Sequence, residues 1–309
     1  MEGGIMYPFI KVKIIADSIS QFDGIRLTTF ELEYPRYIHA EIMTHRVFSR
    51  NAQSSRAVPV DKQLERVRTS PVLPIEWGAN KAGMSSATLL DSAKELIAKK
   101  IWQYGSSISC WVSEVLSKSG LHKQWANRGT EPYSTIKVVI TATEWDNFFW
   151  LRYDKDAAQP EIVELARLMQ EAMDSNTPFL MSEGEWHTPY VEIGLSKLTG
   201  KRIYYDENHE PLTLEEALKI SASCCAQVSY RRLDTSKAKA IEIYDKLFSG
   251  PTPQLSPVEH QATPVLEKYE WGDILGKWPD GVTHLDREGN LWSANFKGWI
   301  QYRQLLGKI

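Results

Sequence analysis

Alternating apolar and polar positions near the N-terminus predict two β-strands, at residues 10–19 and 25–35. A third extended segment begins at residue 132 and becomes helical around Trp145. Apolar residues at helical spacing predict helices at residues 36–49, 86–119, 159–176, 213–230 and 235–248. Strands and helices do not alternate regularly, so the pattern predicts an α+β fold and not a doubly wound sheet.

Local signals sharpen several of these boundaries. Thr213 and Glu216 form the pattern of a capping box at the start of a helix. Gly105 predicts a break in the long helix. Two stretches rich in turn-forming residues predict irregular structure, at residues 57–86 and 177–212. The final segment, residues 296–308, is expected to be a helix.

Composition excludes several classes of protein. The 309 residues are 42% hydrophobic and 24% charged with a net charge of −3, which is typical of a globular protein and not of a general polyanion binder. The sequence has no signal-peptide pattern and no run long enough to span a membrane. The three cysteines (Cys110, Cys224 and Cys225) form no Cys-x-x-Cys pair, which favours a reducing cytoplasm and offers no zinc site.

Residues 44–60, THRVFSRNAQSSRAVPV, concentrate cationic and hydroxyl side chains. Arg46, Arg50 and Arg56 would repel one another unless an anion lay among them, and arginine binds phosphate in a forked geometry. A nucleotide phosphate or a flavin is the functional interpretation. A solvated surface turn is the alternative, because charge clusters are common on surfaces.

The order of these residues resembles the signature of the flavin-dependent thymidylate synthases, Arg-His-Arg-x-x-Ser-x-Asn-Glu-x-Ser-x-Arg. The matching positions are His45, Arg46, Ser49, Asn51, Ser54 and Arg56. Two positions depart from it, since Thr44 replaces the first arginine and Ala52 replaces the glutamate. These departures bear on the contacts to flavin and nucleotide.

Downstream segments extend the resemblance. ANRGTEP (126–132) is similar to the family's Ala-Arg-x-x-x-Pro element through Arg128. NFFWLRYDKDAAQPEI (147–162) is similar to the next element through Asn147 and Arg152. The family has flavin-contacting asparagine and arginine where this chain has Thr141 and Thr143.

The family's early segments occur late in this chain, which suggests a permuted order. AQVSYRRLD (226–234) and SPVEH (256–260) resemble segments that precede the motif in the family. Gln304, near the C-terminus, is a candidate for the nucleotide-contacting glutamine that aligns with Glu41. We therefore expect one catalytic domain, residues 1–309. It has a motif-bearing core (1–176), an irregular connection (177–212) and a relocated segment with a tryptophan-rich tail (213–309).

The resemblance implies conversion of dUMP to dTMP with FAD, NADPH and 5,10-methylenetetrahydrofolate, and without a cysteine nucleophile. It places the catalytic role on Arg152, Ser54 and Arg56. The implied nucleotide contacts are Glu41, Ser54, Arg56, Arg128, Arg152 and Gln304. The implied flavin contacts are His45, Arg46, Ser49, Asn51, Asn147, Ser229 and His260. It also implies a homotetramer, with dUMP and folate as partners and neither nucleic acid nor membrane.

Several of these residues have a structural alternative. Arg152 could pair with Asp154 or Asp156 at the surface. His260 could be an ordinary loop histidine, and His187 either a packing residue or a folate contact. Cys224 and Cys225 are interpreted as small apolar helix residues.

Two alternative functions remain open at this point. The first keeps flavin and folate but hydroxymethylates dUMP or methylates another pyrimidine nucleotide. The second is a nucleotide- or RNA-binding protein without catalysis, which the acidic net charge and the lack of a long basic stripe disfavour.

Overall fold

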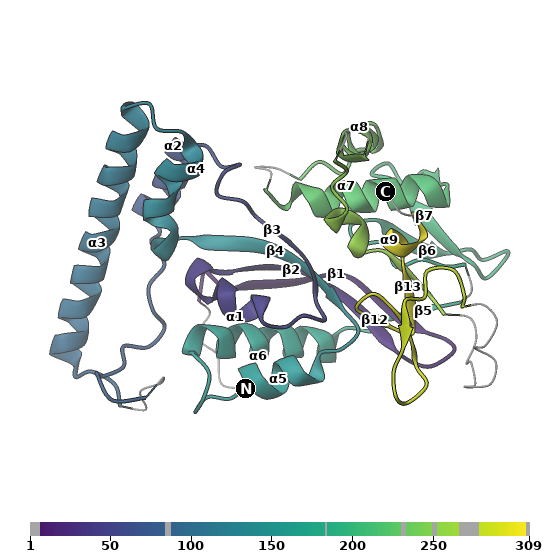
Figure 1. Ribbon diagram of the computed structural model, residues 1–309, viewed down its shortest axis with the longest axis horizontal. Helices are drawn as coiled ribbons and strands as arrows, with labels where there is room; N and C mark the ends of the chain where they lie inside the picture. Colours follow the sequence, from purple (N-terminus) through teal and green to yellow (C-terminus); the bar gives the residue numbers. More distant parts are fainter. Residues whose placement is uncertain are drawn as a thin grey trace.

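The computed structural model describes residues 7–83, 88–182, 184–229, 233–248, 252–265 and 278–306. Its centre is a five-stranded sheet with the order β3-β4-β2-β1-β5 (Figure 1). The strands are β1 (Lys11–Ser20), β2 (Arg26–Pro35), β3 (Ser49–Ala52), β4 (Thr135–Ala142) and β5 (Phe179–Met181). All neighbours are antiparallel except β1 and β5. The predicted α+β class and the first two strands are confirmed.

Two helices, α5 (Asp146–Arg152) and α6 (Pro160–Ser175), cover one face of this sheet (Figure 1). Alternate residues of β2 point to that face and join the apolar stripe of α6 in the main core. The fully buried members include Phe30, Leu32, Tyr34, Ile162, Leu165 and Met169. The extended segment predicted to begin at residue 132 begins at Thr135 as β4. The helix after Trp145 and the amphipathic helix at 159–176 are confirmed.

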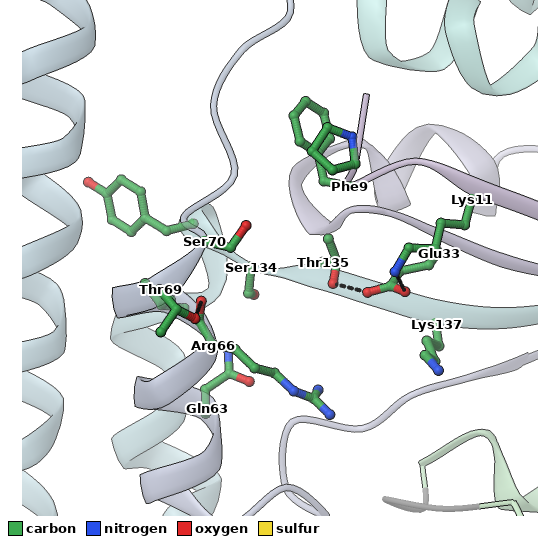
Figure 2. A pocket seen from close by; sticks show the side chains of 13 residues that line it. Phe9, Lys11, Glu33, Gln63, Arg66, Thr69, Ser70, Ser134, Thr135 and Lys137 are labelled. Carbon is green, nitrogen blue, oxygen red and sulfur yellow. Dashed lines mark hydrogen bonds and ion pairs between the residues drawn. The ribbon is translucent and has the colours of Figure 1, made fainter. Parts of the chain in front are cut away.

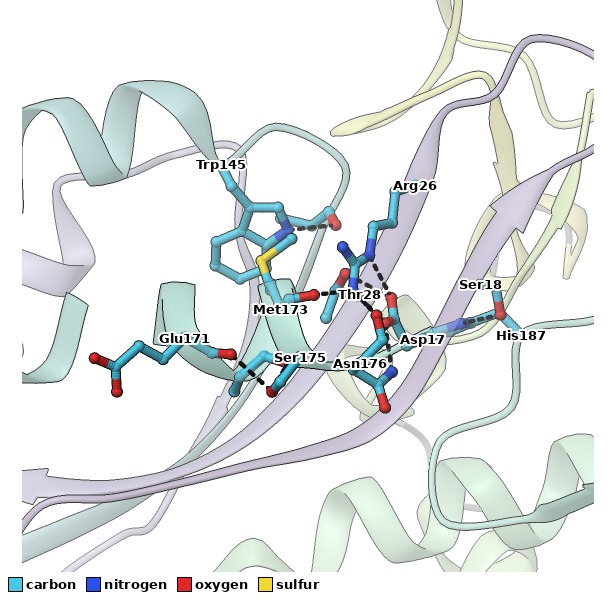
Figure 3. A network of polar contacts seen from close by, with 12 residues as sticks. Asp17, Ser18, Arg26, Thr28, Trp145, Glu171, Met173, Ser175, Asn176 and His187 are labelled. Atoms are coloured by element: carbon cyan, nitrogen blue, oxygen red, sulfur yellow. Dashed lines mark hydrogen bonds and ion pairs between the residues drawn. The ribbon is translucent and has the colours of Figure 1, made fainter. Parts of the chain in front are cut away.

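A buried ion pair anchors the end of α6 to the sheet (Figure 3). The Arg26 guanidinium donates to both carboxylate oxygens of Asp17, at 2.9 and 2.5 Å, and to the carbonyl of Met173 at 2.8 Å. Thr28 and Asn176 donate to the same carboxylate at 2.9 and 2.7 Å. Full hydrogen bonding offsets the desolvation of a carboxylate that is only 4% exposed.

Another group of helices lies beside one end of the sheet (Figure 1). It consists of α2 (Val60–Thr69), α3 (Ser92–Lys118), α4 (Lys123–Ala126) and the 3-10 helix η2 (Asn127–Tyr133). The loop prediction for 57–86 is wrong over α2. The predicted break at Gly105 is wrong as well, because that glycine serves close packing: a Cβ there would lie 2.7 Å from the hydroxyl of Tyr133. Residues 84–87, where the long helix was expected to begin, lie outside the described residues.

Residues 179–248 contribute the edge strand β5 to the central sheet and also form a second, smaller sheet. A three-stranded sheet of β6 (Glu192–Leu195), β7 (Arg202–Tyr205) and β8 (Pro211–Leu212) packs with α7 (Leu214–Ala226), which is followed by η3 (Gln227–Ser229) and α8 (Lys237–Phe248). The prediction that 177–212 is irregular is therefore wrong in part. The capping box of Thr213 and Glu216 is present and confirms the start of α7.

The C-terminal segment forms small strands and not the expected long helix. Its elements are η4 (Ser256–Glu259), β9 (Ala262–Pro264), β10 (His284–Leu285), β11 (Leu291–Ser293), β12 (Phe296–Lys297), β13 (Trp299–Gln301) and the short α9 (Tyr302–Leu305). Phe296 and Trp299 are fully buried against Leu27 and Met181. These tertiary contacts outweigh the local helical pattern.

The helix predicted for residues 36–49 is also shorter than expected. A 3-10 turn, η1 (Arg36–Ile38), leads into α1 (His39–Met43), and β3 starts at Ser49. The Arg50 guanidinium donates to the carbonyls of Met43 and His45, at 3.1 and 3.0 Å, and so satisfies the end of α1. None of the helices in the described ranges has the length and apolar character needed to cross a membrane.

Candidate functional site

Arg152, at the end of α5, lies against the start of the motif. Its guanidinium donates to the Glu41 carboxylate at 2.9 Å, to the Thr44 hydroxyl at 3.1 Å and to Nε2 of His45 at 3.1 Å. The predicted residues Arg152, Glu41 and His45 are therefore brought together. The ion pair that Arg152 forms is with Glu41, where the sequence offered Asp154 or Asp156 as a surface alternative.

His45 is neutral in this arrangement. Burial, followed by the positive charges of Arg152 and Arg50, lowers its pKa to about 4. Because Arg152 donates to Nε2, that nitrogen must be an acceptor, and the ring proton is assigned to Nδ1. The ring packs against Phe48 and Phe148, at centroid distances of 5.5 and 5.1 Å. The site thus presents one oriented neutral imidazole beside one oriented guanidinium.

Three other charged or polar residues, two in the motif segment and one on α5, have different surroundings. Arg46 and Asn147 are exposed, and within the described part of the chain neither side chain forms a hydrogen bond or an ion pair. Arg50 is bound to the end of α1. The expected mutual repulsion of the motif arginines is therefore relieved for Arg50 by backbone carbonyls.

The C-terminal strands engage the middle of the motif. The Ser49 hydroxyl is hydrogen-bonded with the side chains of Asn295 and Gln301, with donor–acceptor distances of 3.1 to 3.3 Å. The Asn51 amide donates to the carbonyl of Cys225 on α7 at 3.1 Å. Ser49 and Asn51 are 2% and 8% exposed, so both side chains hold the motif against the rest of the chain.

A buried chain of hydrogen bonds crosses the sheet and ends at His260. Ser18 is bonded to Nδ1 of His187 at 2.8 Å, and Nε2 of His187 to Thr29 at 2.7 Å. Thr29 is bonded to Thr141 at 2.8 Å, and Thr141 to Nδ1 of His260 at 2.8 Å. Figure 3 shows the first of these contacts. All five groups are at most 1% exposed.

Burial lowers the pKa of both rings to about 3, so His187 and His260 are neutral. Each hydroxyl and each neutral ring has one proton to donate. When every member accepts from one neighbour and donates to the next, the donors along the chain run in one direction. If Ser18 donates at the start, Nε2 of His260 carries a proton; in the opposite direction it carries a lone pair. Nε2 is buried and has no hydrogen-bond partner among the described residues. The chain therefore controls which tautomer His260 presents.

The end of the motif lies beside the segment that contains Arg128. The Asn127 amide donates to the carbonyls of Ser55 and Val58, at 2.8 and 2.9 Å. Arg128, the next residue, is exposed and pairs with Glu131 at 2.9 Å. Arg56 is exposed, and its backbone N–H lies 3.3 Å from the Ser54 hydroxyl. The predicted phosphate-binding segments are adjacent.

A cavity of about 340 Å³ opens next to this end of the motif (Figure 2). The backbone N–H of Gln53 donates to the carbonyl of Lys137, one of its lining residues, at 2.8 Å. Lys11 in the lining is paired with Glu33, whereas the side chains of Arg66 and Lys137 form no ion pair within the described ranges. The lining therefore has excess positive charge, which suits an anionic ligand.

The remaining predicted positions are less engaged. Gln304 is half-buried, and its amide lies 3.5 Å from the side chain of Gln301. Among the described residues, it forms no hydrogen bond with Glu41, His45 or Arg152. The side chain of Ser229 lies outside the described residues. Cys224 and Cys225 are buried in α7, and burial raises the pKa of Cys224 to about 12, so both behave as the apolar helix residues expected.

Sequence reasoning missed most of the side chains that support the site. Ser18 and Thr29 are only polar positions in strands by sequence, Gln301 lies in the predicted helix, and Asn295 immediately precedes it. The sequence allows His187 to be either a packing residue or a folate contact, and its place in the buried hydrogen-bond chain supports the packing interpretation. No group of three or more His, Cys, Asp or Glu side chains that could bind a metal occurs among the described residues.

Residues 26–179 match the family described as thymidylate synthase complementing protein. Two similar solved structures are of a UMP/dUMP methylase, PolB, from Streptomyces cacaoi, bound with 5-Br UMP or 5-Br dUMP. The first is 17% identical, with a TM-score of 0.42, and the match covers 53% of this chain and 88% of that one. The second is 14% identical, with a TM-score of 0.39 and coverages of 54% and 89%. No curated protein sequence matches the chain. Through residues 26–179, which contain the motif, Arg128 and Arg152, the chain belongs to the thymidylate synthase complementing protein family, the flavin-dependent thymidylate synthases.

Proposed function

We propose that the chain methylates dUMP to dTMP, with 5,10-methylenetetrahydrofolate as the carbon donor and FAD reduced by NADPH as the source of electrons. The observation that carries this proposal is the cluster of Arg152, Glu41 and His45, in which α5 meets the start of the family motif. Both segments lie within the residues that match the family.

Arg152 is proposed to hold the uracil ring. Methylation at C5 requires negative charge to build up on that ring, and a fixed cation aimed at the charge lowers the barrier, typically by a few kcal/mol. Three acceptors fix the guanidinium before the substrate binds. His45, being neutral, adds no competing positive charge. Ser54, Arg56 and Arg128 are proposed to bind the phosphate end, as the contacts of Asn127 with the motif support.

The residues near the motif fit a flavin in part. His260 has a buried Nε2 without a partner among the described residues, and Arg46 and Asn147 are exposed and uncommitted. These three, with His45, are the side chains that we propose to hold the cofactor. Ser49 and Asn51 are directed into their own chain and would shape the wall of the site. When bound, the flavin would supply the hydride that reduces the transferred carbon.

The permuted segment order is part of the same proposal. Residues 256–260 resemble a segment that comes before the motif in the family, and here they lie beside β3 and β4. Gln301 links the Glu259 carbonyl to Ser49 across this contact, at 3.2 Å to each. The relocated segment thus reaches the motif from the other end of the chain. A homo-oligomer remains part of the proposal.

A second candidate is hydroxymethylation of dUMP, or methylation of another pyrimidine nucleotide. It is favoured by the surroundings of Arg152, because Thr44 and Glu41 replace an arginine and a glutamine of the family pattern. Glu41 neutralises Arg152, and Thr44 removes a cation from the same site. Less positive charge near the ring would change which nucleotide or which reduction step is favoured.

The test is a reaction of the full chain with FAD, NADPH, 5,10-methylenetetrahydrofolate and dUMP under low oxygen, with nucleotide products identified by mass spectrometry. We expect a gain of one methyl group that is lost in Arg152→Ala. Arg167→Ala is the matched control, because the ion-pair partners of Arg167 among the described residues, Glu164 and Glu171, both lie on α6. A hydroxymethyl product would favour the second candidate. No product and no bound flavin would contradict both and favour a noncatalytic nucleotide- or RNA-binding protein.

A further inference from the structure

The side chains around Arg152 present a fixed set of hydrogen-bonding groups to solvent. The side chains of Arg152 and Glu41 are 19% and 30% exposed, so a ligand can reach both. An arginine carries five N–H donors, and three of those of Arg152 go to Glu41, Thr44 and His45. Within the described ranges, two guanidinium N–H donors therefore remain for a ligand.

The two neighbours of Arg152 at the surface can only accept further hydrogen bonds. In its ion pair with Arg152, the Glu41 carboxylate has no proton to donate. The Thr44 hydroxyl accepts from Arg152 at 3.1 Å and uses its one proton to donate to the Glu41 carbonyl at 2.7 Å. The side-chain donors that Glu41, Thr44 and Arg152 together leave free, as far as the structure describes the chain, therefore all belong to Arg152.

One acceptor beside two donors matches the base-pairing edge of cytosine. Along that edge cytosine presents the donor N4–H₂ and then the acceptors N3 and O2, and a carboxylate is a suitable acceptor for N4–H₂. The amino group would face Glu41, while N3 and O2 would face the two free N–H groups of Arg152. Among the standard bases, only cytosine presents a donor followed by two acceptors.

Uracil fits the same groups less well. Its edge presents O4, N3–H and O2, so its full partner is an acceptor with a donor on each side. Among the described side chains, Arg152 is the one that donates to Glu41, and the Thr44 proton is already used. One carbonyl of uracil would then face an oxygen of Glu41 or Thr44 with no proton between them, which weakens binding.

We propose that this site binds the cytosine base of dCMP more tightly than the uracil base of dUMP, and that Glu41 sets the preference. The inference rests on the proposed function, because it takes Arg152 as the group that holds the pyrimidine ring. Both nucleotides carry the same deoxyribose phosphate, so the proposed phosphate contacts of Ser54, Arg56 and Arg128 do not distinguish them. The preference is therefore a property of the Arg152–Glu41 pair.

The test is the dissociation constant of dCMP and of dUMP, measured by isothermal titration calorimetry with the full chain in the presence of FAD. We expect dCMP to bind about tenfold more tightly, the discrimination typical of a base read by fixed hydrogen bonds. Glu41→Gln should reverse the order, because an amide can donate to O4 of uracil. Glu242→Gln is the matched control, since it makes the same change to an ion-paired glutamate on α8. It should leave the order unchanged.

A modified ligand tests the same contact without changing the protein. The 2-pyrimidinone deoxynucleotide monophosphate lacks the 4-amino group of dCMP and keeps N3 and O2. It should bind the wild type about tenfold more weakly than dCMP, since Glu41 loses its partner. Equal affinity for these two ligands would overturn the inference. So would a wild-type preference for dUMP, or an unchanged order in Glu41→Gln.

The methylation assay separates a failure of this inference from a failure of the proposed function. If the wild type prefers dUMP and converts it to dTMP, the inference is overturned and the proposed function stands. If the wild type prefers dCMP but transfers no methyl group to dUMP, the inference stands and the proposed function is overturned. Binding of neither nucleotide would contradict both.

Discussion

Replacing Thr141 by valine removes one hydroxyl from the middle of the buried hydrogen-bond chain while keeping the shape of the side chain. Thr141 is fully buried, and its hydroxyl joins Thr29 to Nδ1 of His260, with 2.8 Å to each. Valine leaves the His260 ring without a hydrogen bond to any described residue, because its Nε2 already lacks one. A buried polar group left unsatisfied costs about 1–3 kcal/mol, and the lost bond to Thr29 about 1 kcal/mol.

We therefore expect Thr141→Val to lower the free energy of unfolding by about 2–4 kcal/mol, measured by denaturant titration. Thr263→Val is the matched control. The Thr263 hydroxyl is buried and has no partner among the described residues, so its removal should be neutral or slightly stabilising. The two variants make the same chemical change, and only the first breaks hydrogen bonds.

A double variant isolates the chain itself. Thr29→Val and Thr141→Val both delete the bond between these two residues, so the double variant should cost about 1 kcal/mol less than the two single costs added together. If Thr141→Val were as mild as Thr263→Val, or if the two threonine costs were simply additive, the hydrogen-bond chain would not be a connected unit and our reasoning would be wrong.

Three further results are expected. Asp17→Asn should lower the free energy of unfolding by about 3–5 kcal/mol, because it leaves the Arg26 guanidinium with an incomplete partner; chemical denaturation would show it, and a loss under 1 kcal/mol would contradict it. Stability should fall as the pH drops below about 6.5, since His187 and His260 stay neutral in the fold down to a pKa of about 3 while the unfolded chain takes up their protons. Each ring would contribute up to about 1.4 kcal/mol per pH unit. A free energy of unfolding that stays the same between pH 7 and pH 5 would refute this. Arg152→Lys should reduce dUMP turnover at least tenfold in steady-state kinetics, because a lysine lacks the forked geometry that reaches three acceptors at once; unchanged turnover would count against a positioning role for the fork.

The sequence predicts those elements best in which local pattern and tertiary packing agree. The strands at residues 11–20 and 26–35 alternate in sequence and bury one face, and the helix at 160–175 has a continuous apolar stripe. The start of the helix after Thr213 is predicted by the capping-box residues of its first turn. At these positions the local preference already matches the final environment, so one sequence is sufficient to find them.

The secondary-structure predictions are wrong where contacts between residues distant in the sequence determine the backbone conformation. The segment at 296–301 has helical spacing, but Trp299 and Phe296 are drawn into a pocket made by Leu27 and Met181, more than a hundred residues away, and the backbone becomes strands. The helix at 60–69 was not predicted, because its composition is polar and a Pro- and Gly-rich stretch follows it. Leu64 and Val67 nevertheless have helical spacing.

The candidate site likewise contains residues that the sequence could predict and residues that it could not. The contacts of Arg152 with Glu41 and His45 follow from a motif that resembles a known family, so the residues could be named before their geometry was seen. The hydrogen-bond chain could not be named, because Ser18 and His187 are separated by 169 positions and neither has a local signal. Only the sheet register that sets Thr29 opposite Thr141 brings its members into line.

The measurement that tests the central claim most directly is the identity of both products of one reaction with reduced flavin, dUMP and 5,10-methylenetetrahydrofolate. If the flavin provides the electrons and the folate only the carbon, as we propose, the nucleotide gains a methyl group and the folate leaves as tetrahydrofolate. Release of dihydrofolate would mean that the folate itself was oxidised. That result, or an unmodified nucleotide, would contradict the account of this chain as a flavin-dependent dUMP methylase.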